Sequence, residues 1–277
     1  SPLKNPAASR TMKQKRILHF APANGFPSGT YDKLLSFLKS DYSVISIDKV
    51  GHNPNYPVDD NWSNLTKELI NYIEGNSSEP VIGVGHSLGS TLTFMAAYNR
   101  PDLFKQIIML DPPLVYGLPA LMFSVAKKTG LTNRMKLVTL TRKRRVHWAS
   151  REEAEAYYKK KKPFDRFDPE CLRDYIQFGT VSDQTGASLA FDSRVESDIF
   201  RTTPHNMSSF KKKLVVPGAM VIGEKTDMPT RFMVNGFLKK HDLHFMQFKD
   251  GGHLFPLEYP YKTALLIREI IDNPYDD

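Results

Sequence analysis

The chain has 277 residues, of which 40% are hydrophobic, 25% charged and 11% aromatic. This composition is typical of a globular protein and excludes disordered and fibrous classes. A single cysteine, Cys171, excludes an internal disulfide and a cysteine-rich zinc site. No stretch approaches the roughly 20 consecutive apolar residues that span a bilayer, and residues 1–16 lack the apolar core of a signal peptide. We therefore expect a soluble, cytoplasmic protein without stable membrane association.

The positive charge is concentrated in one part of the chain. The formal net charge is +8, from 38 Lys and Arg against 30 Asp and Glu, and residues 131–175 contribute thirteen basic and seven acidic side chains. This segment therefore holds six of the eight excess charges. It is interpreted as a solvated helical face or as a face that attracts anionic substrates, and we do not expect nucleic-acid binding.

The first part of the chain alternates between strand and helix patterns. Short apolar runs predict strands at residues 17–20, 81–85 and 107–110, and an alternating pattern predicts one at 42–48. Helical spacing of apolar residues predicts helices at 30–38, 61–74 and 88–99. Such alternation is typical of a parallel sheet with helices on both faces, joined by right-handed crossovers.

The alternation stops after residue 113 and resumes after residue 210. Residues 114–210 carry helical patterns but no convincing strand, whereas the chain beyond them has strand patterns at 219–222 and 244–248 and helical ones at 232–239 and 261–271. We therefore predict a core domain made of residues 12–113 and 211–277, with a mostly parallel sheet of about six strands. Residues 114–210 are predicted to form a helical lid inserted into that core.

The sequence Gly85-His86-Ser87-Leu88-Gly89 lies between a predicted buried strand and a predicted helix. A G-x-S-x-G motif in this context forms a sharp turn that exposes the serine at the carboxyl edge of the sheet. Glycines on both sides allow the chain to turn where a Cβ atom would clash. Ser87 is therefore the predicted nucleophile.

A serine nucleophile needs a histidine base, and the base needs a carboxylate to orient it. His253 is the predicted base, because it follows Gly252 in a loop between the last strand and the last helix. Asp227 is the predicted acid, since it follows the penultimate strand; Asp111 and Glu224 are alternatives. His86 is interpreted as a packing or hydrogen-bonding neighbour.

The loop Asn24-Gly25-Phe26-Pro27 follows the first predicted strand. We expect the backbone N–H of Phe26 in this loop, together with the N–H of Leu88 after the nucleophile, to form the oxyanion hole. Gly25 and Pro27 are also ordinary turn residues, so a purely structural turn remains an alternative.

With these residues in the order Ser, Asp, His, the chain resembles the α/β-hydrolase superfamily, and in particular its bacterial lipase/esterase-like members with a helical lid. The resemblance covers about residues 16–271, and it implies the α/β-hydrolase fold. Residues 24–27 are similar to the family's His-Gly-x-Pro loop, 48–52 to its Asp-x-x-Gly-His turn, 85–89 to its nucleophile elbow and 252–253 to its Gly-His pair. One departure concerns the acid, because Thr226 occupies the family's usual acid position and Asp227 is one residue further on.

The predicted function is hydrolysis of a carboxylic ester through an acyl-enzyme, with no metal or organic cofactor. Thioesterase, lactonase and carbon–carbon bond hydrolase activities with the same triad are alternatives, as is a binding protein without turnover. The expected partner is a small ester-like substrate, and the basic segment favours an anionic one. We expect a monomer or a homodimer.

Overall fold

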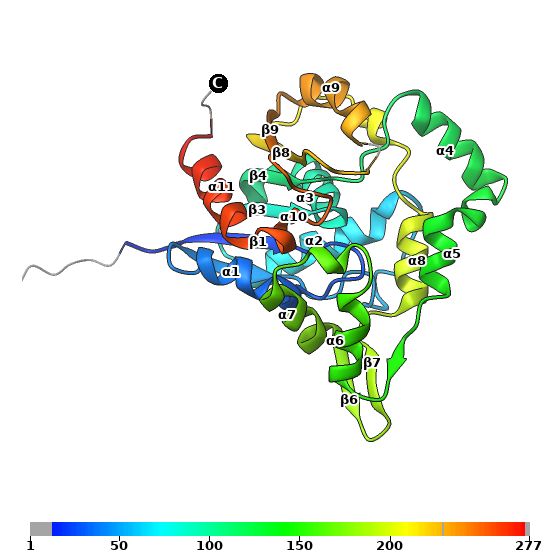
Figure 1. Ribbon diagram of the computed structural model, residues 1–277. Coiled ribbons are helices and arrows are strands. Elements are labelled where there is room, and N and C mark those ends of the chain that lie inside the picture. Colours follow the sequence, from blue (N-terminus) through cyan, green and yellow to red (C-terminus); the bar gives the residue numbers. More distant parts are fainter. Residues whose placement is uncertain (1–12, 229, 275–277) are drawn as a thin grey trace, which may run out of the picture.

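The computed structural model describes residues 13–228 and 230–274, and its centre is a six-stranded parallel sheet (Figure 1). The strands are β1 (Arg16–Ala21), β2 (Tyr42–Ser46), β3 (Val81–His86), β4 (Phe104–Leu110), β8 (Gly218–Gly223) and β9 (His244–Phe248). Their order in the sheet is β2-β1-β3-β4-β8-β9, and every neighbouring pair is parallel. The predicted fold class is confirmed. The outer ends of the predicted core, residue 12 and residues 275–277, lie outside the described residues.

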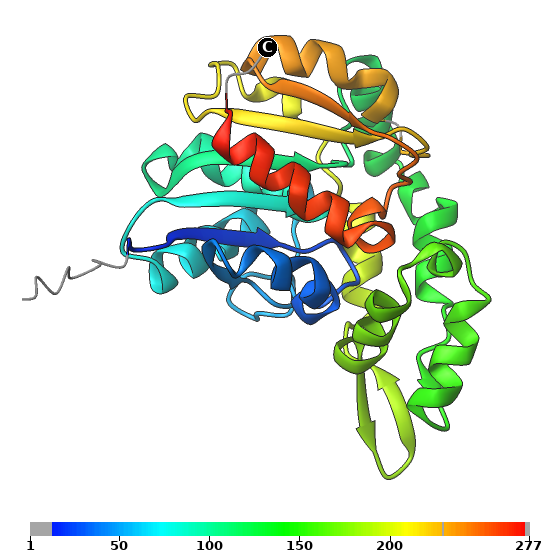
Figure 2. The ribbon, with the colours of Figure 1, turned by 60° about the vertical axis from the view of Figure 1, so that its left-hand side comes forward.

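Helices cover both faces of the sheet. They are α1 (Asp32–Leu38) and α11 (Pro260–Asp272) on one face, and α2 (Ser63–Asn76), α3 (Leu88–Asn99) and α9 (Thr230–His241) on the other (Figures 1 and 2). Successive strand side chains point to opposite faces, so Ile108 and Leu110 pack with α1 and α11, while Ile107 and Met109 pack with α2 and α3. Strands buried on both sides are continuously apolar, which is why short apolar runs predicted them.

Between β4 and β8 the chain leaves the sheet, and we call residues 114–210 of this segment the insert. It contains α4 (Leu118–Lys128), α5 (Lys136–Arg142), α6 (Arg151–Lys159), α7 (Pro169–Gly179) and α8 (Ser193–Arg201). It also contains three short strands, β5 (His147–Trp148), β6 (Thr180–Asp183) and β7 (Gly186–Leu189), paired in the antiparallel order β5-β7-β6. The expectation that this segment has no strand is therefore wrong.

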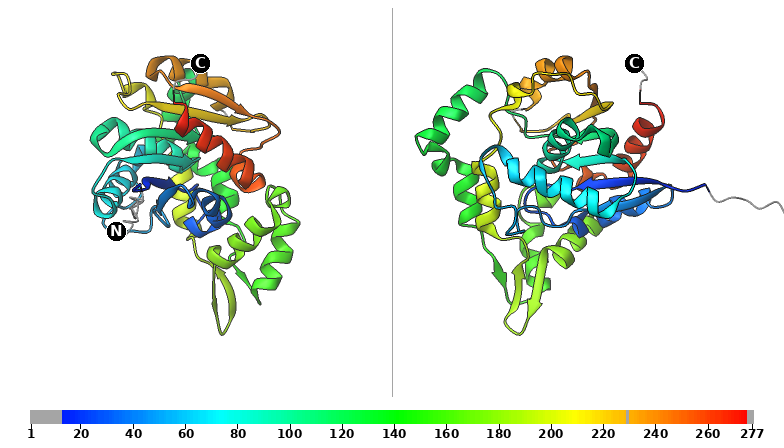
Figure 3. Two further views of the ribbon diagram at one scale, coloured as in Figure 1. Left: turned by 90° about the vertical axis from the view of Figure 1, so that its left-hand side faces the viewer. Right: turned by 180° about the vertical axis from the view of Figure 1, so that it is seen from behind.

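The insert lies beyond the carboxyl ends of the sheet strands (Figure 2), with the β6–β7 hairpin projecting farthest from the sheet in both views of Figure 3. Parallel strands direct all their carboxyl ends to one edge, and ligands bind there in open α/β sheets. The strands β1, β3 and β4 are adjacent, so the loops that follow them are neighbours at this edge of the sheet. In residues 13–228 and 230–274, no helix is both long and apolar enough to cross a membrane.

Candidate active site

Ser87 is held in a strained turn between β3 and α3. Its φ is 53° and its ψ −118°, and its backbone N–H donates to the Leu110 carbonyl at 2.9 Å. A Cβ atom on Gly85 would lie 2.3 Å from the backbone of Gly89, and one on Gly89 would lie 2.0 Å from the Ala21 carbonyl oxygen of β1. The two glycines of the motif are thus required by close backbone contacts, and they let α3 begin directly against the sheet.

The Ser87 hydroxyl and the His253 imidazole are hydrogen-bonded. Ser87 Oγ lies 3.0 Å from His253 Nε2, and His253 Nδ1 lies 2.5 Å from Asp111 Oδ2. A carboxylate only accepts, so Nδ1 carries the proton and the Nε2 lone pair accepts from the Ser87 hydroxyl. This is the arrangement in which an imidazole can remove the proton of an attacking serine.

Asp111 follows β4 and is completely buried. Its Oδ1 accepts from the Gly223 N–H at 2.8 Å, and its Oδ2 accepts from the Thr226 hydroxyl at 2.7 Å. Its own N–H donates to the Val221 carbonyl at 2.8 Å. Three donors, counting His253, therefore fix this carboxylate in place and compensate for its removal from water.

The prediction that Asp227 orients His253 is wrong, because Asp111 occupies that place. β4 and β8 are neighbours in the sheet, so a carboxylate after either strand can reach the same histidine. Thr226, at the family's usual acid position, is turned inward and bonds to Asp111, whereas Asp227 is exposed. The alternative Glu224 accepts from the Asp250 N–H at 2.8 Å.

His86 links the loop before the site to the loop that carries His253. The Ala23 N–H donates to the Tyr31 oxygen at 3.2 Å, and the Tyr31 hydroxyl lies 2.7 Å from His86 Nδ1. His86 Nε2 lies 2.8 Å from the His253 carbonyl oxygen, which can only accept, so Nε2 carries the proton. Burial lowers the pKa of His86 to about 3, which keeps it neutral. It is a hydrogen-bonding neighbour, and it lies between the two loops.

The predicted oxyanion loop forms a tight turn. The Phe26 N–H donates to the Ala23 carbonyl at 3.2 Å, and Gly25 has a φ of 86°, as a type II turn requires at its third position. The Phe26 ring packs against aromatic rings of the insert, at 6.1 Å from Phe164 and 5.4 Å from Tyr175 between ring centroids. The Leu88 N–H belongs to the first residue of α3, directly after the nucleophile.

An ion pair of the insert lies against this turn. Arg144 bonds to both carboxylate oxygens of Glu196, at 2.6 and 3.0 Å, and its second terminal nitrogen donates to the Tyr158 and Tyr175 hydroxyls. The Asn24 side-chain amide donates to the Glu196 carbonyl at 2.9 Å. A Cβ atom on Gly25 would lie 2.8 Å from Glu196 Oε1. Nothing in the sequence pattern pointed to this pair, beyond the membership of Arg144 in a basic cluster.

A second ion pair joins the insert to the His253 loop. Arg166 lies 2.8 Å from Glu258, and Glu258 accepts from the Gly252 N–H at 3.0 Å. Gly252 immediately precedes His253. The turn at residues 23–26 is therefore bonded to the insert through Asn24 and Glu196, and the loop that carries His253 through Glu258 and Arg166.

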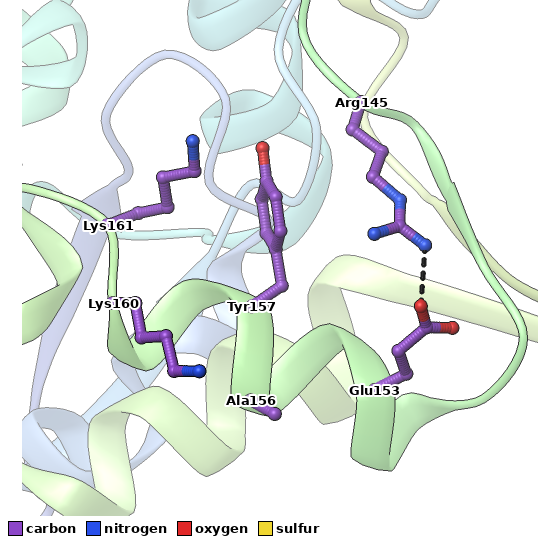
Figure 4. A pocket seen from close by; sticks show the side chains of 6 residues that line it. All are labelled: Arg145, Glu153, Ala156, Tyr157, Lys160 and Lys161. Carbon is purple, nitrogen blue, oxygen red and sulfur yellow. Dashed lines mark hydrogen bonds and ion pairs between the residues drawn. The ribbon is translucent and has the colours of Figure 1, made fainter.

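The basic clusters form shallow surface hollows. One of about 340 Å³ is lined by Arg145, Glu153, Ala156, Tyr157, Lys160 and Lys161. In Figure 4 the Arg145–Glu153 pair lies on one side of the Tyr157 ring and the two lysines on the other. Another, of about 540 Å³, is lined by Arg142, Arg144, Val146, Ser193, Arg194 and Asp198. Neither hollow is lined by Ser87, His253 or Asp111.

Over the described part of the chain, no three His, Cys, Asp or Glu side chains are grouped as metal ligands.

Comparison with known proteins agrees with this geometry. The profile of the alpha/beta hydrolase family matches residues 20–264. The chain belongs to this family. Its members use the carboxyl edge of the sheet as the reactive edge, which is where Ser87 and His253 meet in this alpha/beta hydrolase.

Curated relatives match only part of the chain. A protein named type I acyl-CoA thioesterase mpaH, from Penicillium brevicompactum, is 30% identical over 134 residues, which are 47% of this chain and 29% of that protein. A monoglyceride lipase homolog of Monkeypox virus is 28% identical over 125 residues, 42% of this chain and 45% of that protein. The chain thus matches less than half the length of these relatives.

Solved structures share the fold over nearly the whole chain. An E-2-(acetamidomethylene)succinate hydrolase has a TM-score of 0.75 at 17% identity and covers 94% of this chain and 92% of its own. The thioesterase domain from the curacin biosynthetic pathway has a TM-score of 0.71 at 16% identity and covers 92% of both chains. At such identities the likeness concerns the fold.

Proposed function

We propose that this alpha/beta hydrolase cleaves a carboxylic ester through an acyl-enzyme formed on Ser87. The observation that carries the proposal is the continuous hydrogen-bonded chain from Ser87 through His253 to the buried Asp111. The strained turn presents the Ser87 oxygen at the carboxyl edge of the sheet. Ser87, His253 and Asp111 each have a role in the proposed hydrolysis.

His253 Nε2 removes the Ser87 proton as Oγ attacks the ester carbonyl, and a tetrahedral intermediate forms. The imidazolium then donates this proton to the departing alkoxide, which leaves as an alcohol while Ser87 remains acylated. A water, deprotonated by His253, attacks the acyl group and releases the carboxylic acid and Ser87. Throughout, Asp111 holds His253 in the required tautomer and stabilises its positive charge.

The backbone N–H groups of Leu88 and Phe26 are proposed to bind the negatively charged oxygen of the tetrahedral intermediate. The Leu88 group lies at the N-terminus of α3, where the helix dipole favours negative charge. The Phe26 group is 3.2 Å from the neutral Ala23 carbonyl, a weaker acceptor than an oxyanion. An incoming oxyanion would therefore compete well for this donor.

A thioester is the second candidate substrate class. It is favoured by the thioesterase names of one partial relative and one structural neighbour. The chemistry at Ser87 is the same, with a thiolate as the leaving group. Acyl p-nitrophenyl esters and acyl-coenzyme A of equal chain length, compared by kcat/KM, separate the two classes.

Labelling with a fluorophosphonate, followed by peptide mapping, tests the nucleophile. We expect modification at Ser87, together with turnover of p-nitrophenyl esters. Ser87→Ala and His253→Ala should each lower kcat by on the order of 10⁶ if the groups act as a unit. His147→Ala is the matched control, because His147 is exposed and bonds to Thr185 rather than to the triad.

Absence of labelling at Ser87 in folded protein, with no ester or thioester turned over, would overturn the proposal. So would a His253→Ala variant that keeps the rate of the unchanged protein. Labelling that survives heat denaturation would show that Ser87 is not activated by its neighbours, with the same conclusion.

A further inference from the structure

The outer face of α4 is apolar and exposed. Leu118, Leu121, Met122 and Val125 have relative exposures of 69, 63, 66 and 53%. Their spacing of i, i+3, i+4 and i+7 places them on one side of the helix. A surface helix of a globular protein normally turns its apolar side toward the core. Because these four side chains are exposed, the apolar side of α4 is not covered by any other part of the described chain.

The apolar surface continues beyond α4. Leu131, Met135, Leu137, Leu140 and Val146 are between 41 and 56% exposed. They lie in the turn after α4, in α5 and just beyond it, along one margin of the molecule in Figure 1 and in the right-hand view of Figure 3. Together with the α4 stripe they form what we call the α4–α5 face, within residues 114–146.

The charges within this segment have a single sign. Residues 114–146 contain eight Lys and Arg and no Asp or Glu. Four of the eight pair with carboxylates from elsewhere in the chain: Lys127, Arg142, Arg144 and Arg145. The other four are exposed, and no carboxylate of the described residues lies in ion-pair range of them: Lys128, Arg134, Lys136 and Lys143.

We propose that the α4–α5 face binds reversibly to the surface of an anionic lipid bilayer. Exposed Leu and Met side chains can enter the boundary between headgroups and acyl chains, while the unpaired cations meet anionic headgroups. Surface binding of this kind needs no membrane-spanning helix. A second copy of the chain is a poorer occupant, because two such faces would bring eight unpaired cations together.

The proposed binding differs from the expectation, drawn from the sequence, of a protein without stable membrane association. Scanning for long apolar runs finds helices that cross a bilayer, but it does not find a short helix whose apolar side faces outward. The α4–α5 face also follows Asp111 closely in the chain, since α4 begins at Leu118. The proposal does not depend on the proposed reaction at Ser87.

Sedimentation with large unilamellar vesicles tests the proposal. Vesicles of phosphatidylcholine alone are compared with vesicles containing 30% (~0.3 mole fraction) phosphatidylglycerol, in ~0.1 M salt where the Debye length is about 10 Å. We expect the full chain to sediment with the anionic vesicles and to remain in solution with the neutral ones. Raising the salt to about 1 M, where the Debye length is about 3 Å, should weaken binding.

Two sets of substitutions separate the apolar from the charged contribution. Lys128→Gln with Lys136→Gln should lower the partition coefficient by more than about tenfold, since each cation near an anionic surface contributes about fivefold. Leu121→Ser with Met122→Ser should lower it by a similar factor, because two exposed apolar side chains can no longer enter the bilayer. All four residues are exposed, so folding should be unaffected.

Matched controls lie elsewhere on the surface. Lys160→Gln with Lys161→Gln removes the same charge from the hollow of Figure 4, and Val181→Ser with Val215→Ser removes exposed apolar side chains outside the α4–α5 face. Both controls should sediment with anionic vesicles as the unchanged protein does.

Three outcomes would overturn the proposal. They are no sedimentation with anionic vesicles, equal loss in the control and test variants, and binding that is insensitive to Leu121→Ser with Met122→Ser. Light scattering after gel filtration adds a fourth. A dimer that these two serine substitutions convert to a monomer, without any vesicle binding, would assign the face to self-association.

Discussion

Asp111 and Asp227 differ in their exposure to solvent. Asp111 is fully buried, lies 2.5 Å from His253 and accepts from Gly223 and Thr226, whereas Asp227 is exposed. The position that commonly supplies the acid in this family is here a threonine whose hydroxyl donates to Asp111. The difference between the two aspartates can be measured directly.

We predict that Asp111→Asn lowers kcat for p-nitrophenyl ester hydrolysis by about 10⁴, because an amide no longer holds His253 in the required tautomer. Asp227→Asn should leave kcat unchanged. Circular dichroism and urea unfolding of both variants show whether each is folded. Equal activity of Asp111→Asn and the unchanged protein, or a comparable loss in Asp227→Asn, would return the assignment to Asp227.

The sequence was sufficient to predict the positions of Ser87 and His253 but not which aspartate meets them. Ser87 sits in a motif whose glycines are required by backbone contacts, and His253 follows the last strand, so each is tied to a known place on the sheet. The carboxyl ends of β4 and β8 are adjacent, so either could deliver the acid. The choice depends on which side chain turns inward, and that is decided by tertiary packing.

At the level of elements, the insert is connected to the loops around Ser87 by a hydrogen bond and by an ion pair. Glu196 of α8 bonds to Asn24 beside the Phe26 turn, and Arg166 bonds to Glu258 beside Gly252. The side chains of Arg144 and Glu196 are 20 and 8% exposed, so neither is well hydrated. Removing one partner leaves the other charged and poorly solvated.

We predict that Glu196→Ala lowers the free energy of unfolding by about 3 kcal/mol, the lower end of the cost of breaking a buried ion pair, because Arg144 stays partly hydrated. Urea unfolding measures this value. Lys213→Ala, which removes one partner of an exposed pair with Asp242, is the matched control and should cost less than about 1 kcal/mol. Equal costs for the two variants would contradict a buried, stabilising pair.

The inner strands β3 and β4 could be predicted from short apolar runs that are buried on both faces, and the edge strand β2 from its alternation. The strands of the insert could not. β5 has two residues, and β6 and β7 have four each, with three of the four β6 side chains exposed. Strands this short carry neither a measurable alternation nor an apolar run, and they form because the β6–β7 hairpin pairs with a distant segment.

For the molecule as a whole, buried histidines connect stability to pH. Burial lowers the pKa of His19 and His86 to about 3 and that of His241 to about 4. His19 Nε2 accepts from the Ile47 N–H, and His241 Nδ1 accepts from the Leu214 N–H. Protonation of either nitrogen would break these bonds, so both residues fold as neutral imidazoles.

These three histidines should destabilise the fold in acid. Below pH 6.5 the unfolded chain protonates them and the folded chain does not, so stability falls as the pH falls from 6.5 towards 4, by up to about 1.4 kcal/mol per pH unit for each group. Burial raises the pKa of Glu68 to about 7 and that of Asp174 to about 6. These two carboxyls bind protons more tightly when folded, so each opposes the loss between its folded and its ordinary pKa: Glu68 from pH 7 to 4.5, and Asp174 from pH 6 to 3.8. Below pH 4.5 only Asp174 still opposes it.

We therefore predict a shallow loss of stability from pH 6.5 to 4.5 and a steeper loss below pH 4.5. Urea midpoints measured at half-unit intervals of pH give the slope. His241→Asn should reduce the slope between pH 6 and 4.5 by up to about 1.4 kcal/mol per pH unit, because the amide oxygen can still accept from the Leu214 N–H but does not titrate. His147→Asn serves as the control, since His147 is exposed. A slope that His241→Asn and His147→Asn leave equally unchanged would show that burial of His241 does not couple folding to protonation.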